Sequence, residues 1–214
     1  MKTLFKLSAL FVGALLMSQG ASATVFDFAS YADSLHQDTS YSPSFDWTQG
    51  GLTLSASGEQ YPVTGTQYYA YLDYGHAGLG VCKTSNCNGS SDDNVGANEL
   101  LKIVFDQTVT LTTLNFRNAT HGTYFGQNDY FAVAVDGSSF TSMLLGGAIS
   151  TSLTGKEFAF RVADGSPNSF GNSGTQFYLG ALDAHAVPEP GTLALMGLGL
   201  FGLSFAARRR SMAS

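Results

Sequence analysis

The 214-residue sequence has few cysteines, few prolines and few basic residues. It contains two cysteines, five prolines, and 10 lysines and arginines against 16 aspartates and glutamates. Two thiols with no histidine nearby cannot supply the four ligands of a structural zinc ion. The excess of negative charge repels phosphate backbones, which argues against nucleic acid as a partner.

Recognisable catalytic motifs are also missing. The sequence has neither the G-x-S-x-G nor the H-E-x-x-H pattern, and so we expect no catalytic residues and no enzyme activity. The histidines are isolated from one another, and a surface position is the simplest interpretation of each. They are His36, His76, His121 and His185, of which His121 is the most suggestive because its loop is polar and aromatic.

The first 23 residues have the features of a secretory signal peptide. Lys2 and Lys6 flank the start of an apolar stretch, Leu7–Met17, and Ala21 and Ala23 form an A-x-A cleavage site. The apolar stretch is too short for a lasting membrane span. We therefore expect export by the Sec translocon and cleavage by signal peptidase after Ala23.

Residues 24–186 form the expected ectodomain. From residue 24 to residue 190 the chain holds five basic residues and all 16 acidic ones, a net formal charge of −11. Short stretches of alternating apolar and polar residues are separated by Gly, Asn, Asp and Ser, as in "ELLKIVF" and "FAVAVDG", the latter ending in an Asp-Gly turn signal. This pattern predicts an all-β domain, an antiparallel β-sandwich of jelly-roll type.

One predicted strand changes its apolar face midway. In "TVTLTTLNF", Val109 and Leu111 share one face, whereas Leu114 and Phe116 lie one residue out of phase. A β-bulge near Thr112 and Thr113 would return all four to the core, as would a bend that moves the chain to another sheet.

The two cysteines, Cys82 and Cys87, lie close together in the sequence. Export to an oxidising compartment favours a disulfide between them, and the spacing differs from the C-x-x-C of redox pairs. Closing so short a loop should stabilise the fold by roughly 2 kcal/mol.

Several oxygen-bearing side chains suggest calcium as the one conceivable cofactor, in a structural role. Glu99 begins an apolar strand and needs a partner, which could be a metal, a backbone amide or Arg117. Asp183 is in phase with apolar residues that should be core, where a carboxylate needs compensation. Carboxylates solvated at the rim of the sheet are the alternative. The candidate ligands are Asp93, Asn94, Glu99 and Asp183, with Asp27 as a further candidate.

Aromatic residues are abundant, and tyrosines gather in "YPVTGTQYYAYLDYG". Alternation along a strand leaves some of them exposed, and an exposed aromatic ring can stack on a sugar. We consider Trp47, Tyr69 and Tyr71 as candidate ligand-binding residues. The alternative is that the tyrosines cover a sheet face with their hydroxyls in water.

The stretch "VPEPGTLALMGLGLFGLSFAARRRSMAS" reads as an extended segment, a membrane helix and a basic cluster. Residues 192–207 carry no charge and are long enough for a marginal span, with Arg208, Arg209 and Arg210 on the cytoplasmic side. Its G-x-G-x-x-G match follows no strand and does not indicate a dinucleotide site.

This stretch closely resembles the PEP-CTERM sorting signal of exported bacterial proteins. The resemblance rests on Val187–Gly191, the apolar run and Arg208–Arg210. It implies that exosortase, a membrane enzyme, recognises Pro188, Glu189 and Pro190 and removes a temporary inner-membrane anchor. It also implies a Gram-negative host that makes exopolysaccharide, with the protein ending at the cell surface or in the extracellular matrix. A plain single-pass anchor is the alternative.

The middle of the chain is similar, more loosely, to β-sandwich surface proteins that accompany this signal. The similarity rests on "GLGV", "DNVGANE" and "LKIVFDQTVTLTTLNFRN". This similarity bears on the fold and implies no agreed activity. For a secreted, acidic β-sandwich delivered to the surface, we expect a structural or adhesive role in an exopolysaccharide or biofilm matrix, with extracellular polysaccharide as a partner. The alternatives are a carbohydrate-binding, lectin-like module, an enzyme acting on matrix glycans, and a protein-binding module.

Overall fold

The structure is a computed structural model that describes residues 23–85, 87, 93–163, 175–188, 197 and 199–202. The described residues between 23 and 188 form antiparallel strands and one short helix, which confirms the expected all-β class. The elements are β1 (Thr24–Asp27), α1 (Phe28–Leu35), β2 (Thr39–Tyr41), β3 (Phe45–Gln49), β4 (Leu52–Gln60), β5 (Gln67–Asp73), β6 (Gly78–Cys82), β7 (Glu99–Asn118), β8 (Tyr130–Val135), β9 (Thr141–Leu144), β10 (Ile149–Val162) and β11 (Phe177–Ala186).

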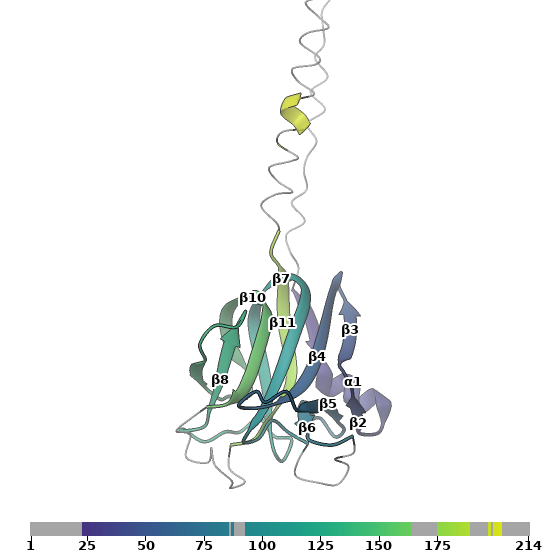
Figure 1. Ribbon diagram of the computed structural model, residues 1–214, viewed down its shortest axis with the longest axis vertical. Coiled ribbons are helices and arrows are strands. Elements are labelled where there is room, and N and C mark those ends of the chain that lie inside the picture. The colour runs from purple at the N-terminus through teal and green to yellow at the C-terminus, as the bar shows by residue number, and fades with distance from the viewer. Residues whose placement is uncertain are drawn as a thin grey trace, which may run out of the picture.

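The strands form one sheet that closes on itself. Its order is β1-β11-β6-β5-β4-β7-β10-β8-β9, with β2 beside β5 and β3 beside β4. Because β11 also pairs with β7, the strands β4, β5, β6, β11 and β7 close into a five-stranded ring (Figure 1). The jelly-roll-like sandwich predicted from the sequence therefore does not describe this part of the chain, which is a single curled sheet rather than two facing ones.

The long strand β7 causes this closure because it bends near its middle. Its first half pairs with β4, ending at Phe105, and its second half pairs with β11, starting at Val109. Opposite the bend, the register on β10 advances by only two residues while β7 advances by five, from Val104 to Val109. The extra residues let β7 bend, so that this one strand pairs with both β4 and β11 and closes the ring.

The predicted β-bulge in β7 is confirmed. Asp183 of β11 pairs with Thr113 and Ala184 pairs with Leu111, which leaves Thr112 as an extra residue. An extra residue reverses which face the following side chains occupy. The apolar residues on both sides of it are therefore all buried: Val109, Leu111, Leu114 and Phe116.

A second bulge corrects the expected position of Asp183. Leu179 pairs with Phe116 and Ala181 pairs with Asn115, so Gly180 is an extra residue on β11. The alternation is reversed beyond Gly180, and Asp183 lies half-buried on the outer face while its neighbours turn inward. The predicted core position of this carboxylate was wrong because the alternation was read through the glycine as if the strand were regular.

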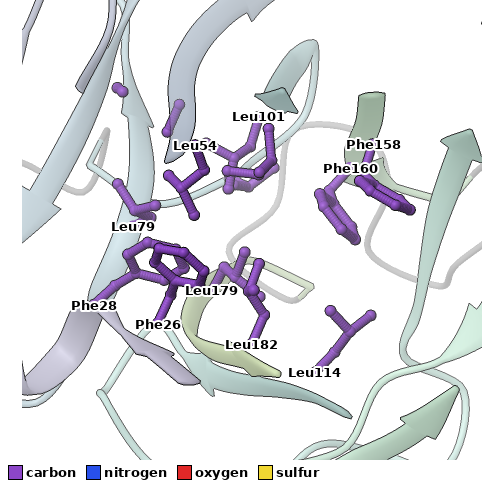
Figure 2. Close-up of a cluster of buried hydrophobic side chains, with 14 of the residues drawn as sticks. Phe26, Phe28, Leu54, Leu79, Leu101, Leu114, Phe158, Phe160, Leu179 and Leu182 are labelled. Atoms are coloured by element: carbon purple, nitrogen blue, oxygen red, sulfur yellow. The ribbon is translucent and has the colours of Figure 1, made fainter. Parts of the chain in front are cut away.

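The hydrophobic core joins the strands of the ring to β1, α1, β8 and β10. Figure 2 shows apolar side chains from β1, α1, β4, β6, β7, β10 and β11 converging there. Leu101, Ile103 and Phe105 share the inner face of β7, as the alternation predicts, and are at most 2% exposed. The Asp136–Gly137 turn after β8 is also present, and both residues have the positive φ angles, 49° and 72°, that such turns require.

Helix α1 was not expected from the sequence. Asp27, considered above as a calcium ligand, is its N-cap: the carboxylate accepts hydrogen bonds from the Ser30 backbone N–H at 2.9 Å and the Ser30 hydroxyl at 2.8 Å. This satisfies a backbone donor that a helix start leaves unpaired. Phe28 and Ala32 are buried in the core, and the short helix packs against β5, β6 and β11.

The domain has two distinct ends. At the terminal end, Thr24 pairs with Ala184, and the Val187 N–H donates to the Thr108 carbonyl at 2.9 Å. At the loop end lie β2, β5, β6 and the first residues of β11 (Figure 1). With about 3.3 Å per residue, the 10 residues of β11 separate these ends by roughly 30 Å.

Candidate functional site

The predicted disulfide between Cys82 and Cys87 is confirmed, at the loop end. Both cysteines are buried and pack against Tyr71, with the partly buried Tyr69 beside them. The bridge therefore fixes the segment that follows β6 against β5.

Two glycines of β6 let the "GLGV" segment lie in close contact with the "DNVGANE" segment and with β11. A Cβ on Gly80 would lie 1.9 Å from the backbone oxygen of Asp93, so only glycine lets residues 93–96 cross β6 at this distance. A Cβ on Gly78 would lie 2.6 Å from the Leu179 carbonyl oxygen of β11. The two motifs thus form one contact, which brings Asp93 to the first residues of β11.

A cluster of ionisable side chains lies at this contact, and we call it the carboxylate–tyrosine cluster. The Tyr178 hydroxyl on β11 donates a hydrogen bond to Asp93 Oδ1 at 2.8 Å. Nε2 of His121 lies 3.1 Å from Oδ2 of Asp73, the last residue of β5. Five separate segments contribute its members: Asp38, Tyr71, Asp73, Asp93, His121 and Tyr178.

Burial decides the protonation of the cluster. It raises the pKa of Asp73 to about 6, with Asp93 adding to the rise and the Tyr178 hydrogen bond and His121 opposing it. Burial also raises the pKa of Asp93, against its hydrogen bond from Tyr178. The pKa values of Tyr71 and Tyr178 rise by burial and the nearby carboxylates, so both phenols stay protonated. The site can hold protons near neutral pH.

His121 is positioned by the loop that follows β7. The side-chain oxygen of Asn118 accepts hydrogen bonds from the backbone N–H groups of Thr120 and Gly122, both at 2.9 Å, and from the Thr120 hydroxyl. Its amide nitrogen donates to the Tyr124 carbonyl at 2.8 Å. His121 has a φ of 63°, and its ring packs edge-on against Tyr178 with centroids 5.4 Å apart.

The β5–β6 turn, residues 74–77, meets this histidine. Asp38 accepts a hydrogen bond from the Tyr74 N–H at 2.9 Å, and Asp33 accepts from the N–H groups of Gly75 and His76. Although burial opposes it, these backbone donors lower the pKa of Asp33. The Gly75 carbonyl lies 2.8 Å from His121 Nδ1, and a Cβ on Gly75 would lie 3.2 Å from that nitrogen.

The structure divides the four candidate calcium ligands between two places. Asn94 donates to the Gln176 side chain at 3.1 Å. Glu99 accepts a hydrogen bond from the Gly96 N–H at 2.6 Å, so a backbone amide, one of the three expected partners, is the one the structure shows. Its carboxylate also lies 3.4 Å from Lys83 Nζ, a partner that was not expected. Asp183 lies on β11, several residues beyond Tyr178, whose hydroxyl contacts Asp93. Among the described residues, no three His, Cys, Asp or Glu side chains are grouped in a way that could hold a metal ion.

The candidate ligand-binding aromatics are not the most exposed ones. The ring of Trp47 packs against Phe26 at 5.7 Å and Phe28 at 5.6 Å between centroids, and Tyr71 is 1% exposed. Two other tyrosines face solvent at the loop end: Tyr74 is 45% exposed and Tyr124 is 83% exposed. Tyr74 lies on the β5–β6 turn and Tyr124 lies on the loop after β7, and these two segments contact each other through His121 and Gly75.

Sequence reasoning identified only part of this cluster. It singled out Asp93 and, more weakly, His121, and it missed the roles of Asp38, Asp73 and Tyr178. Asp73 carried a usable signal, because it precedes the turn glycine Gly75 at the end of an apolar strand. Such a carboxylate is half enclosed by the sheet and needs a partner.

The expected delivery signals fall largely outside the described residues. Of the predicted processing determinants, Pro188 is described and exposed, whereas Glu189, Pro190, Arg208, Arg209 and Arg210 lie outside, as do residues 1–22 of the expected signal peptide. In the part of the chain that the structure describes, no helix has the length and apolar character needed to cross a membrane.

The molecule is thus an antiparallel β-domain whose last strand leads directly into an expected sorting segment. The family model of the PEP-CTERM protein-sorting motif matches residues 186–210, beginning at the final residue of β11. The chain therefore carries a PEP-CTERM signal, as the sequence predicted, and is an exported, transiently membrane-anchored substrate of exosortase. No curated protein and no solved structure gives a significant match.

Proposed function

We propose that the domain is a non-enzymatic, adhesive component of the cell surface or extracellular matrix of a Gram-negative bacterium. In this proposal it binds the exopolysaccharide of the host's biofilm matrix through its loop end. Tyr74 and Tyr124 are the contact residues. The observation that carries the proposal is the exposure of these two tyrosines, 45% and 83%, on loops opposite the end that carries the sorting motif.

The tyrosines are suited to sugar stacking because their backbones are fixed while their rings are exposed. The Tyr74 N–H is held by Asp38, and the Tyr124 carbonyl is held by Asn118. A rigid aromatic platform loses little conformational entropy on binding, and one face of a sugar ring packs well on it. Trp47 and Tyr71 support the fold instead, since their neighbours in the domain cover most of their surface.

The position of the sorting motif supports the same orientation. The motif begins at Ala186, and Val187 is still hydrogen-bonded to β7. An anchor or attachment point there leaves the loop end roughly 30 Å further out, at about 3.3 Å for each residue of β11. Ligands in the matrix would meet Tyr74 and Tyr124 first.

Binding is testable with polysaccharide purified from the host. The Tyr74→Ala/Tyr124→Ala variant should lose most of its retention on the immobilised polymer, whereas Tyr74→Phe/Tyr124→Phe should keep it, because the ring does the stacking. Val25→Ala is the matched control, since Val25 is also 45% exposed but lies at the terminal end. Equal retention of the alanine variant and the parent would reject these tyrosines as the contact.

The competing function is an enzyme acting on matrix glycans. Two carboxylates with raised pKa values, Asp73 and Asp93, favour it, because glycoside hydrolysis uses a carboxyl pair in different protonation states. The burial of Asp73, which is 5% exposed, argues against direct contact with a sugar. New reducing ends after incubation with the host polymer, absent with Asp93→Asn, would favour the enzyme over the adhesin.

A further inference from the structure

Strand β9 is the last strand of the sheet. It pairs with β8 on one side, and no described strand lies on its other side. A free sheet edge is a row of unpaired backbone N–H and C=O groups, which can pair with a strand of another chain. Proteins commonly protect such edges with charged side chains or proline, so the residues of an edge strand indicate whether it is open to a partner.

Four of the described strands have a single neighbour, and three of these carry such protection. β1 contains Asp27 and β3 contains Asp46, while β2 lies between Asp38 and Pro43. β9 has no charged residue and no proline, either within the strand or within four residues on each side of it. Among the described strands, β9 is therefore the unprotected edge.

The backbone of β9 directs the groups of alternate residues to its free side. Just after the strand, the Leu145 N–H donates to the Asp129 carbonyl at 2.8 Å, which continues the ladder with β8. In an antiparallel ladder, residue pairs that exchange backbone hydrogen bonds alternate with pairs that exchange none. Because Leu145 belongs to a bonding pair, Met143 does too. The backbone groups of Ser142 and Leu144 therefore point away from β8.

An apolar side chain is exposed beside the same edge. Leu144 is 49% exposed, and its partner across the ladder, Tyr130, is 37% exposed. A further strand paired along β9 would cover part of Leu144. Such a strand would therefore add apolar burial to the backbone hydrogen bonds that it makes.

The charge pattern indicates which partner fits this edge. No charged residue occurs between Asp136 and Lys156, a stretch that holds β9 and the first half of β10, whereas residues 24–190 carry a net formal charge of −11. A basic partner would be drawn to the acidic surfaces of the domain instead of this stretch. A partner as acidic as the domain itself meets the least repulsion here. A second copy of the chain is such a partner, and it brings an identical free edge.

We propose that β9 is a self-association edge, along which two copies of the exported domain pair antiparallel about a twofold axis. The axis passes beside Met143, so that Ser142 of each copy lies opposite Leu144 of the second copy. These residues exchange their outward backbone hydrogen bonds, and the two sheets become continuous. The pairing is independent of polysaccharide binding, although a dimer would present two loop ends to the same polymer.

Sedimentation equilibrium of the mature exported protein tests the association. Between about 1 and 300 µM, the protein should show a reversible monomer–dimer equilibrium. Raising the salt concentration from about 50 to about 500 mM should lower the dimer dissociation constant several-fold, because salt screens the repulsion between two acidic copies. A protein that stays monomeric under all these conditions, or a dimer that salt weakens, would overturn the proposal.

A proline variant tests the edge itself. Ser142→Pro removes an outward N–H and keeps the ladder with β8, because residue 142 makes no backbone hydrogen bond to that strand. It deletes one hydrogen bond from each copy and should raise the dimer dissociation constant at least about tenfold. Ser142→Thr, which keeps the N–H, is the matched control and should stay within about twofold of the parent. Equal dimerisation of Ser142→Pro and the parent would place the contact elsewhere and reject β9.

Hydrogen exchange of the parent protein decides the matter even if Ser142→Pro does not fold. The amides of Ser142 and Leu144 should gain protection as the protein concentration rises through the dimer dissociation constant. The Met143 amide, which is bonded to β8 in each copy, should be protected already at the lowest concentration. Exchange of the Ser142 and Leu144 amides that does not depend on concentration would rule out pairing along β9.

Discussion

The two ends of the domain are held together by different kinds of interaction. At the terminal end, backbone ladders join β1, β11 and β7, and aromatic rings pack beneath them, with Phe26 between Trp47 at 5.7 Å and Phe105 at 5.8 Å. At the loop end, crossing segments are joined by carboxylates, tyrosines and a histidine. Apolar packing does not titrate, whereas the polar cluster does, so the two ends should respond differently to pH.

The two ends also differ in what they lie next to and what they expose. The terminal end lies next to the sorting motif, which begins at Ala186. The loop end presents exposed tyrosine rings, whose backbones are held by side-chain hydrogen bonds from Asp38 and Asn118. Four predictions, in order of decreasing effect, test this contrast.

Removing an aromatic ring from the terminal end should have the largest effect. Phe105 is 2% exposed, and Phe105→Ala should destabilise the domain by about 3–5 kcal/mol through lost burial and a cavity. Denaturant unfolding should give the same loss at pH 5 and pH 8. Phe105→Leu, which keeps more of the volume, should lose less; a loss that varies with pH would contradict the contrast.

At the loop end, the change Asp73→Asn should alter stability in a pH-dependent way. The folded pKa of Asp73, about 6, exceeds the ordinary 3.8, so its favourable contribution is complete below pH 3.8 and is lost as the pH rises through 6. The variant lacks this loss. Its stability relative to the parent should therefore rise by up to about 3 kcal/mol between pH 4 and pH 8.

Equilibrium unfolding at both pH values measures that change. The matched control is Asp46→Asn, at an exposed carboxylate of β3 outside the carboxylate–tyrosine cluster. A flat difference between Asp73→Asn and the parent would show that Asp73 is not held protonated in the fold.

Removing the disulfide should cost less than removing a core ring. The Cys82→Ser/Cys87→Ser variant should lose about 2 kcal/mol, since the closed loop is short. Chemical reduction of the parent should reproduce the loss. If reduction leaves the unfolding midpoint unchanged, the bridge adds no stability and serves only to shape the loop beside Tyr71.

The smallest effect is expected at the helix cap. Asp27→Ala removes the acceptor for the Ser30 N–H and should cost about 1 kcal/mol. Asp27→Asn keeps a capping oxygen and should stay within a few tenths of a kcal/mol of the parent. Thermal unfolding of both variants distinguishes a cap from a metal ligand, because only a metal ligand would make the difference depend on added calcium.

The alternation in the sequence predicted the local features of the sheet. It located the bulge at Thr112, the Asp136–Gly137 turn and the inner face of β7, because each depends on residues that are neighbours along one strand. It failed at Gly180, where a glycine carries no side chain to reveal an extra residue. Asp183 was misplaced for that reason.

The closure of the ring and the carboxylate–tyrosine cluster could not be derived this way. The bend between Phe105 and Val109 sits in an uninterrupted strand pattern, so nothing local distinguishes it from a straight strand. The cluster joins Asp38 to Tyr178 across most of the chain. Periodicity reports which face a side chain occupies, and it carries no information on which distant segment it will meet.

The pairing of β1 with β11 has a consequence for biogenesis. The ribosome makes β1 about 150 residues before the strand it hydrogen-bonds to, and until then the edges of β6 and β7 that β11 will cover are also open. The sheet is therefore incomplete until β11 has been made. The strand that completes the domain is made immediately before the sorting motif, which begins at the last residue of β11, so closure of the sheet and arrival of the sorting segment are consecutive events.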